Sequence, residues 1–388
     1  MVRAARHRDR ARARCGGRRM TPDARYGPAE PAQPAQPAAG AGASAPLGTT
    51  TRPTATALAA TATTKENRAP MTPEQTTWFA ETFGALVANV GRAVLGKEHA
   101  VRLALTAMLS DGHLLLEDAP GTGKTSLAKA IAATVQGTHH RIQFTPDLLP
   151  SDVTGVTIYD QGTGRFEFHP GPVFTSVLLA DEINRASPKT QSALLEVMEE
   201  GQVTVDGVTH PVGRPFMVIA TQNPIEQAGT YRLPEAQLDR FLIKTSLGYP
   251  DRASTVEILA GAKDRTTGLQ PKITTKAVAD MADLAGTVHI DAAVLDYVAR
   301  LLEATREDAQ TSLGASVRGG LALVRCSKVW AASDGRGFVV PDDIKALAVP
   351  ILAHRLVLDT EAEFAGVTAV QVIERIVAST APPAQRAA

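Results

Sequence analysis

A glycine-rich stretch carries the residues whose types and spacing most clearly suggest a chemistry. It follows an apolar run at residues 114–116 and precedes a helix-forming run at residues 126–131. A strand, a glycine-rich turn, the tripeptide Gly-Lys-Thr and a helix, in that order, are typical of a phosphate-binding P-loop. Backbone N–H groups of such a turn converge on phosphates, and the following helix directs its positive end at them.

Two side chains of this loop have specific expected roles. Lys124 is predicted to reach the β- and γ-phosphates of a nucleotide, and the Thr125 hydroxyl is predicted to bind Mg²⁺. The strict pattern begins with glycine where this chain has Asp118, whereas the residues that touch phosphate match it. The alternative interpretation is a tight strand-to-helix turn with a surface lysine. The residues predicted to bind nucleotide are Asp118, Ala119, Pro120, Gly121, Thr122, Gly123, Lys124, Thr125 and Ser126.

An acidic pair further along the chain supplies a second signature. Asp181 and Glu182 end the apolar run at residues 177–180, which is typical of a buried parallel strand. Acids at the carboxyl end of such a strand lie where α/β sheets place ligands. We expect Asp181 to hold Mg²⁺ through water and Glu182 to polarise the attacking water. The alternative is that Glu182 is only a favourable charge at the start of the next helix.

Three more polar residues stand at the ends of predicted elements. Asn223 follows the apolar run at residues 216–222, where it is placed to contact the γ-phosphate or the water. An isolated asparagine before a proline is otherwise a turn former. Arg240 ends a short helix predicted within residues 233–241, and Arg318 begins a later helix. A lone arginine at a helix start is usually a solvated surface group.

Composition limits the classes of function. The 388 residues suffice for two or three domains, and the formal net charge of zero gives no global electrostatic case for binding nucleic acid. Aromatic residues, at 4%, offer little for base stacking. Cys15 and Cys326 give neither a disulfide framework nor zinc-site spacing, and they suit a reducing cytoplasm. No apolar run approaches the roughly 18–20 residues of a membrane span.

The composition changes sharply near residue 70. Residues 1–70 are rich in arginine, alanine and proline and lack regularly spaced large apolar residues, so we expect a disordered tail. A start assigned too early, with translation beginning at Met71, and an arginine-rich targeting segment are the alternatives. Residues 71–250 are predicted to form a nucleotide-binding core, and residues 251–388 a helical lid domain.

The pattern of apolar residues and turns predicts the elements that hold these residues. Helices are expected from Pro73 and over residues 98–109. The strands are predicted near residues 113–117, 141–144, 177–182 and 216–223. Two Gly-containing turns predict hairpins over residues 156–168 and 201–209. The later helices are predicted near residues 251–262, 275–286, 291–307, 316–332, 341–352 and 367–379. The predicted fold class is therefore an α/β P-loop NTPase core with a parallel sheet and β-hairpin insertions, followed by an all-α lid.

Several motifs in this order resemble the MoxR family of AAA+ ATPases. The resemblance covers about residues 71–379 and leaves the N-terminal tail unexplained. Its marks, taken together, are far more specific than a P-loop alone. They are the loop with its preceding residues at 115–125, Asp-Glu-Ile-Asn-Arg-Ala at 181–186, Ala-Thr-Gln-Asn-Pro at 220–224, Leu-Pro-Glu-Ala-Gln-Leu-Asp-Arg-Phe at 233–241, and Ala-His-Arg at 353–355.

This resemblance implies further roles for individual residues. Asn223 is similar to sensor 1, which positions the lytic water, and Arg240 matches the arginine finger that completes a neighbouring subunit's site. Arg318 matches sensor 2, which contacts nucleotide from the lid, either in its own subunit or in the adjacent one. The two hairpins look like insertions that line the central face of a ring. Residues 95–97 resemble the segment that flanks adenine.

The resemblance also implies an activity and an assembly. MoxR-like proteins hydrolyse ATP with Mg²⁺, are thought to form hexameric rings, and act as chaperones that remodel partners. Those partners are often proteins with von Willebrand A domains and sometimes metalloenzymes. Two alternatives stay open: a magnesium-chelatase-like motor subunit or DNA-remodelling ATPase, and a nucleotide-sensing scaffold without turnover. We expect a cytoplasmic homo-oligomer with client proteins, with neither a membrane span nor a nucleic-acid partner.

Overall fold

The computed structural model describes residues 70–223, 230–231, 233–261, 266 and 268–383. The predicted N-terminal tail lies outside these residues up to position 69. So do Pro224 of the Ala-Thr-Gln-Asn-Pro motif, position 262 of the helix predicted over 251–262, and residues 384–388 of the predicted lid. Residues 64–388 cluster as one unit by their contacts, and it is this unit that is described below.

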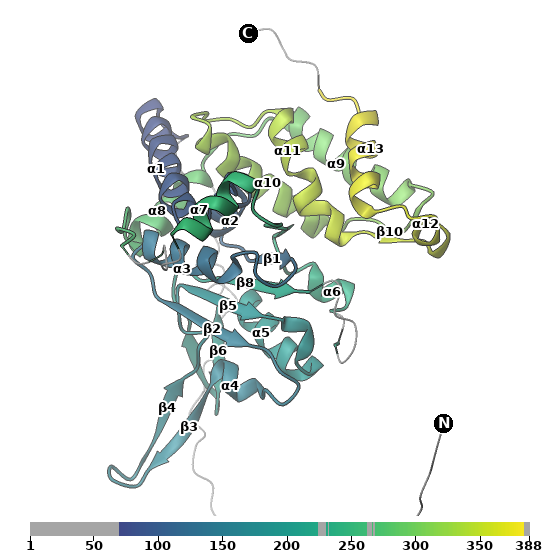
Figure 1. Cartoon of the computed structure of the whole chain (residues 1–388). Helices are drawn as coiled ribbons and strands as arrows, with labels where there is room; N and C mark the ends of the chain where they lie inside the picture. Colours follow the sequence, from purple (N-terminus) through teal and green to yellow (C-terminus); the bar gives the residue numbers. More distant parts are fainter. Residues whose placement is uncertain (1–69, 224–229, 232, 262–265, 267, 384–388) are drawn as a thin grey trace, which may run out of the picture. The chain divides into compact units, whose positions relative to one another are not determined.

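Five parallel strands form the central sheet. Four of them lie where the apolar runs predict, whereas the fifth, over residues 243–245, was not predicted, because a strand of three residues carries no usable periodicity. β1 lies between β8 and β9, with β5 and then β2 beyond β8. Figure 1 labels β1, β8, β5 and β2. Because all five run in one direction, their carboxyl ends meet at a single edge. The strands are β1 (Leu114–Glu117), β2 (His139–Gln143), β5 (Val177–Asp181), β8 (Met217–Gln222) and β9 (Ile243–Thr245).

Successive strand residues feed two apolar clusters on opposite faces of the sheet. Leu114 and Leu116 belong to the first cluster, whereas Leu115 between them belongs to the second. This alternation is the period-two geometry of a strand, applied to strands that are buried on both faces. The first cluster includes residues of α1 (Pro73–Gly91), α2 (Glu98–Leu109) and α3 (Lys124–Thr134), and the second includes residues of α5 (Pro188–Glu200).

The first helix forms where its sequence signals predict. Thr72 caps α1, accepting from the N–H of Gln75, while the Gln75 side chain accepts from the N–H of Thr72. This reciprocal pair is a capping box, and Pro73 stands at the first helical position. Phe79 and Phe83, one turn apart, are buried against the first apolar cluster.

The C-terminal part is helical, as predicted, and packs around α1 and α2 (Figure 1). An antiparallel ribbon, β10 (Thr311–Leu313) with β11 (Val357–Leu358), was not predicted, because strands this short carry no usable periodicity. The helices are α7 (Arg252–Ala260), α8 (Thr275–Ala285), α9 (Ala292–Glu307), α10 (Val317–Ser333), α11 (Pro341–Leu352), α12 (Thr360–Phe364) and α13 (Ala369–Ser379). The smaller elements between the strands of the sheet are α4 (Pro150–Thr154), α6 (Glu235–Leu238) and the 3₁₀ turn η1 (Ile183–Arg185), and a second 3₁₀ turn, η2 (Ala353–Arg355), follows α11.

Both predicted hairpins are present. One is β3 (Gly155–Asp160) with β4 (Arg165–Pro170), which projects from the sheet (Figure 1). The other is β6 (Gln202–Val205) with β7 (Val208–Pro211). Phe168 stacks on His210 with ring centroids 4.0 Å apart, which joins the two hairpins. Among the described residues, no helix is both long and apolar enough for a membrane crossing.

A buried histidine fastens the amino end of β1. The Nδ1 atom of His113 accepts from the N–H of Val218 at 3.0 Å, so Nε2 carries the proton and donates to the Met198 carbonyl at 3.0 Å. His113 therefore joins β1 to β8 and α5 in its neutral form. Burial lowers the pKa of His113 to about 4, against an ordinary value of 6.5.

We predict that this histidine makes the fold acid-sensitive. Between pH 6.5 and 4 the unfolded chain binds a proton at His113 and the folded chain does not, so stability falls as the pH falls through that window. From pH 7 to pH 5 its share of the loss is about 2 kcal/mol. Urea unfolding of the wild type and of His113→Phe at both pH values checks this, because the variant should lose about that much less. Equal losses in the two proteins would contradict it.

Candidate functional site

The predicted P-loop is the turn between β1 and α3. The backbone φ is +83° at Gly121 and +96° at Gly123, a region that glycine enters without penalty. A β-carbon added at either position would meet nothing within 4 Å. Glycine is therefore favoured here by the positive φ of the backbone and not by a lack of room for a side chain. Gly123 caps α3, which places Lys124, Thr125 and Ser126 in the first turn of that helix.

The loop folds back on itself around the lysine. The Lys124 ammonium donates to the Asp118 carbonyl at 3.2 Å, and the Thr122 hydroxyl donates to the Ala119 carbonyl at 3.3 Å. Pro120 and Gly121 are exposed at the tip of the turn. The helix start, its free N–H groups and the lysine therefore face the carboxyl edge of the sheet together, which is an arrangement suited to phosphate.

Asp181 stands at the same edge, at the end of β5. One carboxylate oxygen accepts from the Thr221 hydroxyl at 2.6 Å, and the other accepts from the Arg141 guanidinium at 2.7 Å. Carboxylate and hydroxyl oxygens are the ligands that Mg²⁺ prefers, and such a site usually takes its remaining ligands from phosphates and water. Thr125 and Asp181 fit this role.

Glu182 is held in an unusual backbone conformation. Its φ of +56° lies in the left-handed region, which costs a residue with a β-carbon about 1–2 kcal/mol. Its N–H donates to the Thr221 hydroxyl at 2.9 Å, while its carboxylate accepts from Gln143 at 2.7 Å and Arg185 at 3.1 Å. Glu182 stands at the N-cap position of the 3₁₀ turn η1 but makes no side-chain capping bond there, and the long helix α5 begins only at Pro188, after a Ser187 cap.

Thr221 and Gln143 were missed by sequence reasoning. Thr221 is fully buried and bonds both acidic residues, and Gln143 ends β2 beside Asp181. The rule that strand ends gather at one edge would have found Gln143. Asn223, which was predicted, follows β8 between the strands that carry the loop and the acidic pair. The N–H of Asp118 donates to the Gln222 carbonyl at 3.1 Å and so ties this strand end to the loop.

The two predicted arginines lie at the opposite edge of the sheet. Arg240 lies three positions before Ile243, where β9 begins, and its guanidinium pairs with Glu199 at 3.1 Å. Arg318, from the start of α10, pairs with the same carboxylate. β1, of four residues, separates the edges by about 13 Å at ~3.3 Å per residue. The structure thus brings Arg240 and Arg318 together, but not to their own P-loop.

A buried arginine holds the segment that presents Arg240. Arg355 is only 2% exposed in its side chain and pairs with Asp239 at 2.6 Å. Its guanidinium also donates to the Phe241 carbonyl at 2.7 Å. A β-carbon at Gly319 would lie 3.0 Å from this side chain, so the glycine after Arg318 lets α10 approach it. The Ala-His-Arg motif therefore positions both arginines.

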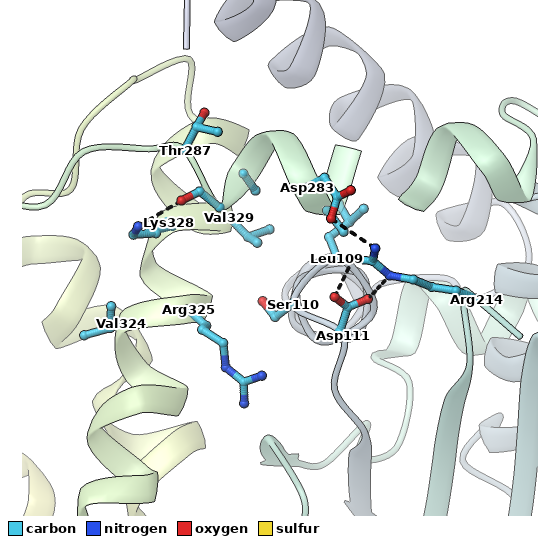
Figure 2. A pocket seen from close by; sticks show the side chains of 13 residues that line it. Leu109, Ser110, Asp111, Arg214, Asp283, Thr287, Val324, Arg325, Lys328 and Val329 are labelled. Atoms are coloured by element: carbon cyan, nitrogen blue, oxygen red, sulfur yellow. Dashed lines mark hydrogen bonds and ion pairs between the residues drawn. The ribbon is translucent and has the colours of Figure 1, made fainter. Parts of the chain in front are cut away.

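A cavity of about 520 Å³ lies between the start of β1 and the C-terminal helices. Figure 2 shows Arg214 at its wall, bonded to Asp111 and Asp283. The hydrogen bonds to Asp111 raise the pKa of Arg214 above its ordinary value. Arg325 and Lys328 also line the cavity, but no P-loop or acidic-pair residue does. This cavity is therefore separate from the phosphate site.

Comparison with known proteins identifies related chains. Residues 113–243 match the ATPase family associated with various cellular activities (AAA), and residues 303–376 match the AAA lid domain. Chaperone MoxR1 of Mycobacterium tuberculosis is 40% identical over 78% of this chain and 82% of its own length. Protein YeaC of Bacillus subtilis, which is uncharacterised, is 45% identical over 79% of this chain and 96% of its own. A crystal structure of an inferred ATPase from Cytophaga hutchinsonii has a TM-score of 0.75 at 39% identity, covering 80% of this chain and 98% of its own.

We predict that the Thr221 hydroxyl stabilises the acidic pair. In Thr221→Val, Asp181 loses a donor and the Glu182 N–H loses its acceptor in a fully buried place, so unfolding should become easier by about 1–3 kcal/mol. Thr221→Ser keeps the hydroxyl and loses only a methyl group, which is worth about 0.8 kcal/mol. Urea unfolding of both variants decides the point. If serine and valine cost the same, the hydroxyl has no such role.

Proposed function

Because this chain belongs to the MoxR family of AAA+ ATPases, we propose that it hydrolyses ATP to ADP and phosphate and acts as a chaperone that remodels partner proteins. The name of the Mycobacterium tuberculosis relative supports the chaperone activity. The observation that carries the proposal is the gathering of Lys124, Asp181 and Glu182 at the carboxyl edge of one sheet.

In the proposed reaction these side chains divide the work of phosphoryl transfer. Lys124 leaves the Asp118 carbonyl for the β- and γ-phosphates, where its charge offsets that of the transition state. Thr125 and Asp181 would hold Mg²⁺, which would supply further positive charge beside the phosphates. Glu182 polarises the attacking water, which Asn223 helps to position. The bonds from Gln143 and Arg185 restrain Glu182 until it turns to that water.

The placement of the arginines supports a site shared between subunits. Arg240 and Arg318 cannot serve their own P-loop from the other edge of the sheet, so we assign both to the nucleotide of a neighbour. Such a head-to-tail contact closes into a ring when the rotation permits, and we propose a hexamer. Their pairs with Glu199 are 30–46% exposed and so are worth only about 0–1 kcal/mol, which lets them exchange Glu199 for phosphate.

The β3–β4 hairpin offers a surface for clients. Its apolar side chains Ile158, Tyr159 and Phe166 are 49%, 51% and 74% exposed, which is costly in water and typical of an interaction site. We propose that this hairpin contacts the proteins that are remodelled, among which von Willebrand A-domain proteins and metalloenzyme complexes are candidates. A rise in ATP turnover on adding DNA, with none on adding protein clients, would favour a DNA-remodelling ATPase instead.

We predict that Glu182→Gln binds ATP but hydrolyses it at least about a hundredfold more slowly, because a neutral amide cannot polarise the water as a general base. Nucleotide binding is measured by calorimetry and turnover by phosphate release. In ATP the variant should also retain partners in a pull-down that wild type releases. Glu303→Gln, at an exposed carboxylate on α9, is the control. Wild-type turnover in Glu182→Gln would remove the role assigned to Glu182.

We predict that a neighbour supplies Arg240. Lys124→Ala loses phosphate binding, and Arg240→Ala loses a group that as an arginine finger is worth ~10³–10⁵ in rate. Each variant alone should therefore be inactive. A one-to-one mixture should recover turnover, because about a quarter of the interfaces of a randomly mixed ring join an intact Lys124 to an intact Arg240.

The mixture needs two controls. Arg300→Ala, an arginine on α9 that pairs with Asp296, should hydrolyse ATP like the wild type. Mixing Lys124→Ala with Glu182→Gln should restore little, because the intact phosphate site there lacks its glutamate. If the mixture of Lys124→Ala with Arg240→Ala assembles into rings but is as inactive as either variant alone, Arg240 lies outside the shared site.

A further inference from the structure

Asp118 occupies the loop position where the strict P-loop pattern has glycine, and its side chain makes contacts that glycine could not. The residue is 4% exposed. Its two carboxylate oxygens accept from the backbone N–H groups of Leu247, at 2.6 Å, and Gly248, at 2.8 Å. Bonds from N–H groups to an ionised acceptor are roughly twice as strong as neutral ones, so this is a firm tie.

The segment whose N–H groups bond to Asp118 is the connection between the sheet and the C-terminal helices. β9 ends at Thr245 and α7 begins at Arg252, so Leu247 and Gly248 lie between them. The same connection is held a second time, where the Lys97 ammonium donates to the Tyr249 carbonyl at 2.7 Å. The two side chains that hold this connection belong to Lys97 and Asp118, and both residues are predicted to lie beside the nucleotide.

The main chain of Asp118 faces the phosphate site at the same time. Its carbonyl accepts from the Lys124 ammonium, and its N–H donates to the end of β8. One residue thus contacts the phosphate-binding lysine through its backbone and the connection to the helices through its carboxylate. A shift of Lys124 toward a phosphate changes the bonding of this residue directly.

We propose that Asp118 is a positioning residue that couples phosphate binding at Lys124 to the connection at residues 247–248. The C-terminal helices that follow carry Arg318, and Arg355 in the turn after α11 holds the segment with Arg240. This tie therefore links the phosphate site of one subunit to the two arginines, Arg240 and Arg318, that it is proposed to present to the next. The link to the arginines of the next subunit rests on the proposed ATPase function. The tie itself is a property of the folded chain.

Hydrogen exchange of the full chain without nucleotide tests the tie. The amides of Leu247 and Gly248 should exchange at least about tenfold faster in Asp118→Gly than in wild type, because their acceptor is gone. Asp118→Asn, which keeps one carbonyl oxygen, should lie between them. Asp343→Asn is the matched control: this carboxylate is also buried and accepts from the Val340 N–H, but it lies on α11. Unchanged exchange in Asp118→Gly overturns the proposal, even if the chain hydrolyses no ATP.

Kinetics and nucleotide-dependent exchange test the coupling. Asp118→Gly should lower kcat about tenfold while KM stays within about threefold. The phosphate contacts remain in this variant, but the arginines are no longer held in position relative to the phosphate site. Adding ATP should alter exchange at residues 247–254 in wild type and Asp343→Asn, but not in Asp118→Gly. A merely structural role would leave kcat and the ATP-dependent exchange of the folded variant unchanged, and that result overturns the coupling. Absence of turnover in wild type would instead sink the proposed function.

Discussion

The common direction of the five central strands is the constraint on which the rest of the site depends. Parallel strands bring their carboxyl ends to one edge, and that edge carries Lys124, Asp181 and Asn223. The same geometry sends Arg240, just before β9, to the other edge. A change of side-chain rotamer cannot cross the length of a strand in a packed sheet. A chemistry that needs both edges therefore needs a second copy of the chain.

The C-terminal helices contact the amino edge of the sheet through bonds of different strength. At the amino edge, Arg355 is buried and its partner Asp239 is 20% exposed, so loss of Asp239 would leave a buried charge without its partner, a change that typically costs about 3–5 kcal/mol. The neighbouring pairs of Glu199 with Arg240 and Arg318 are exposed and weak. The scaffold that presents the arginines is thus rigid, while the arginines themselves are held loosely enough to exchange partners.

The acidic pair, in contrast to the two arginines, is held firmly in place. Thr221 bonds both Asp181 and Glu182 from a fully buried position, and Glu182 keeps a left-handed backbone that is unfavourable by itself. Strain of this kind persists only where the surrounding structure over-determines it, and it concentrates at functional sites. In the proposed reaction the backbone of Glu182 is therefore already in place, and only its carboxylate has to turn toward the water.

The sequence by itself determined the P-loop, four of the five central strands, both hairpins and most of the helices. Each of these depends on local signals, such as glycine at a positive φ or the period of apolar residues. Only the tertiary structure decided what Asp118 holds, since its partner Leu247 lies 129 positions away. The same is true of the bond between Thr221 and Asp181, across 40 positions, and of Arg355 with Asp239, across 116. These contacts depend on strand order and on the docking of the C-terminal helices, and no local pattern encodes either.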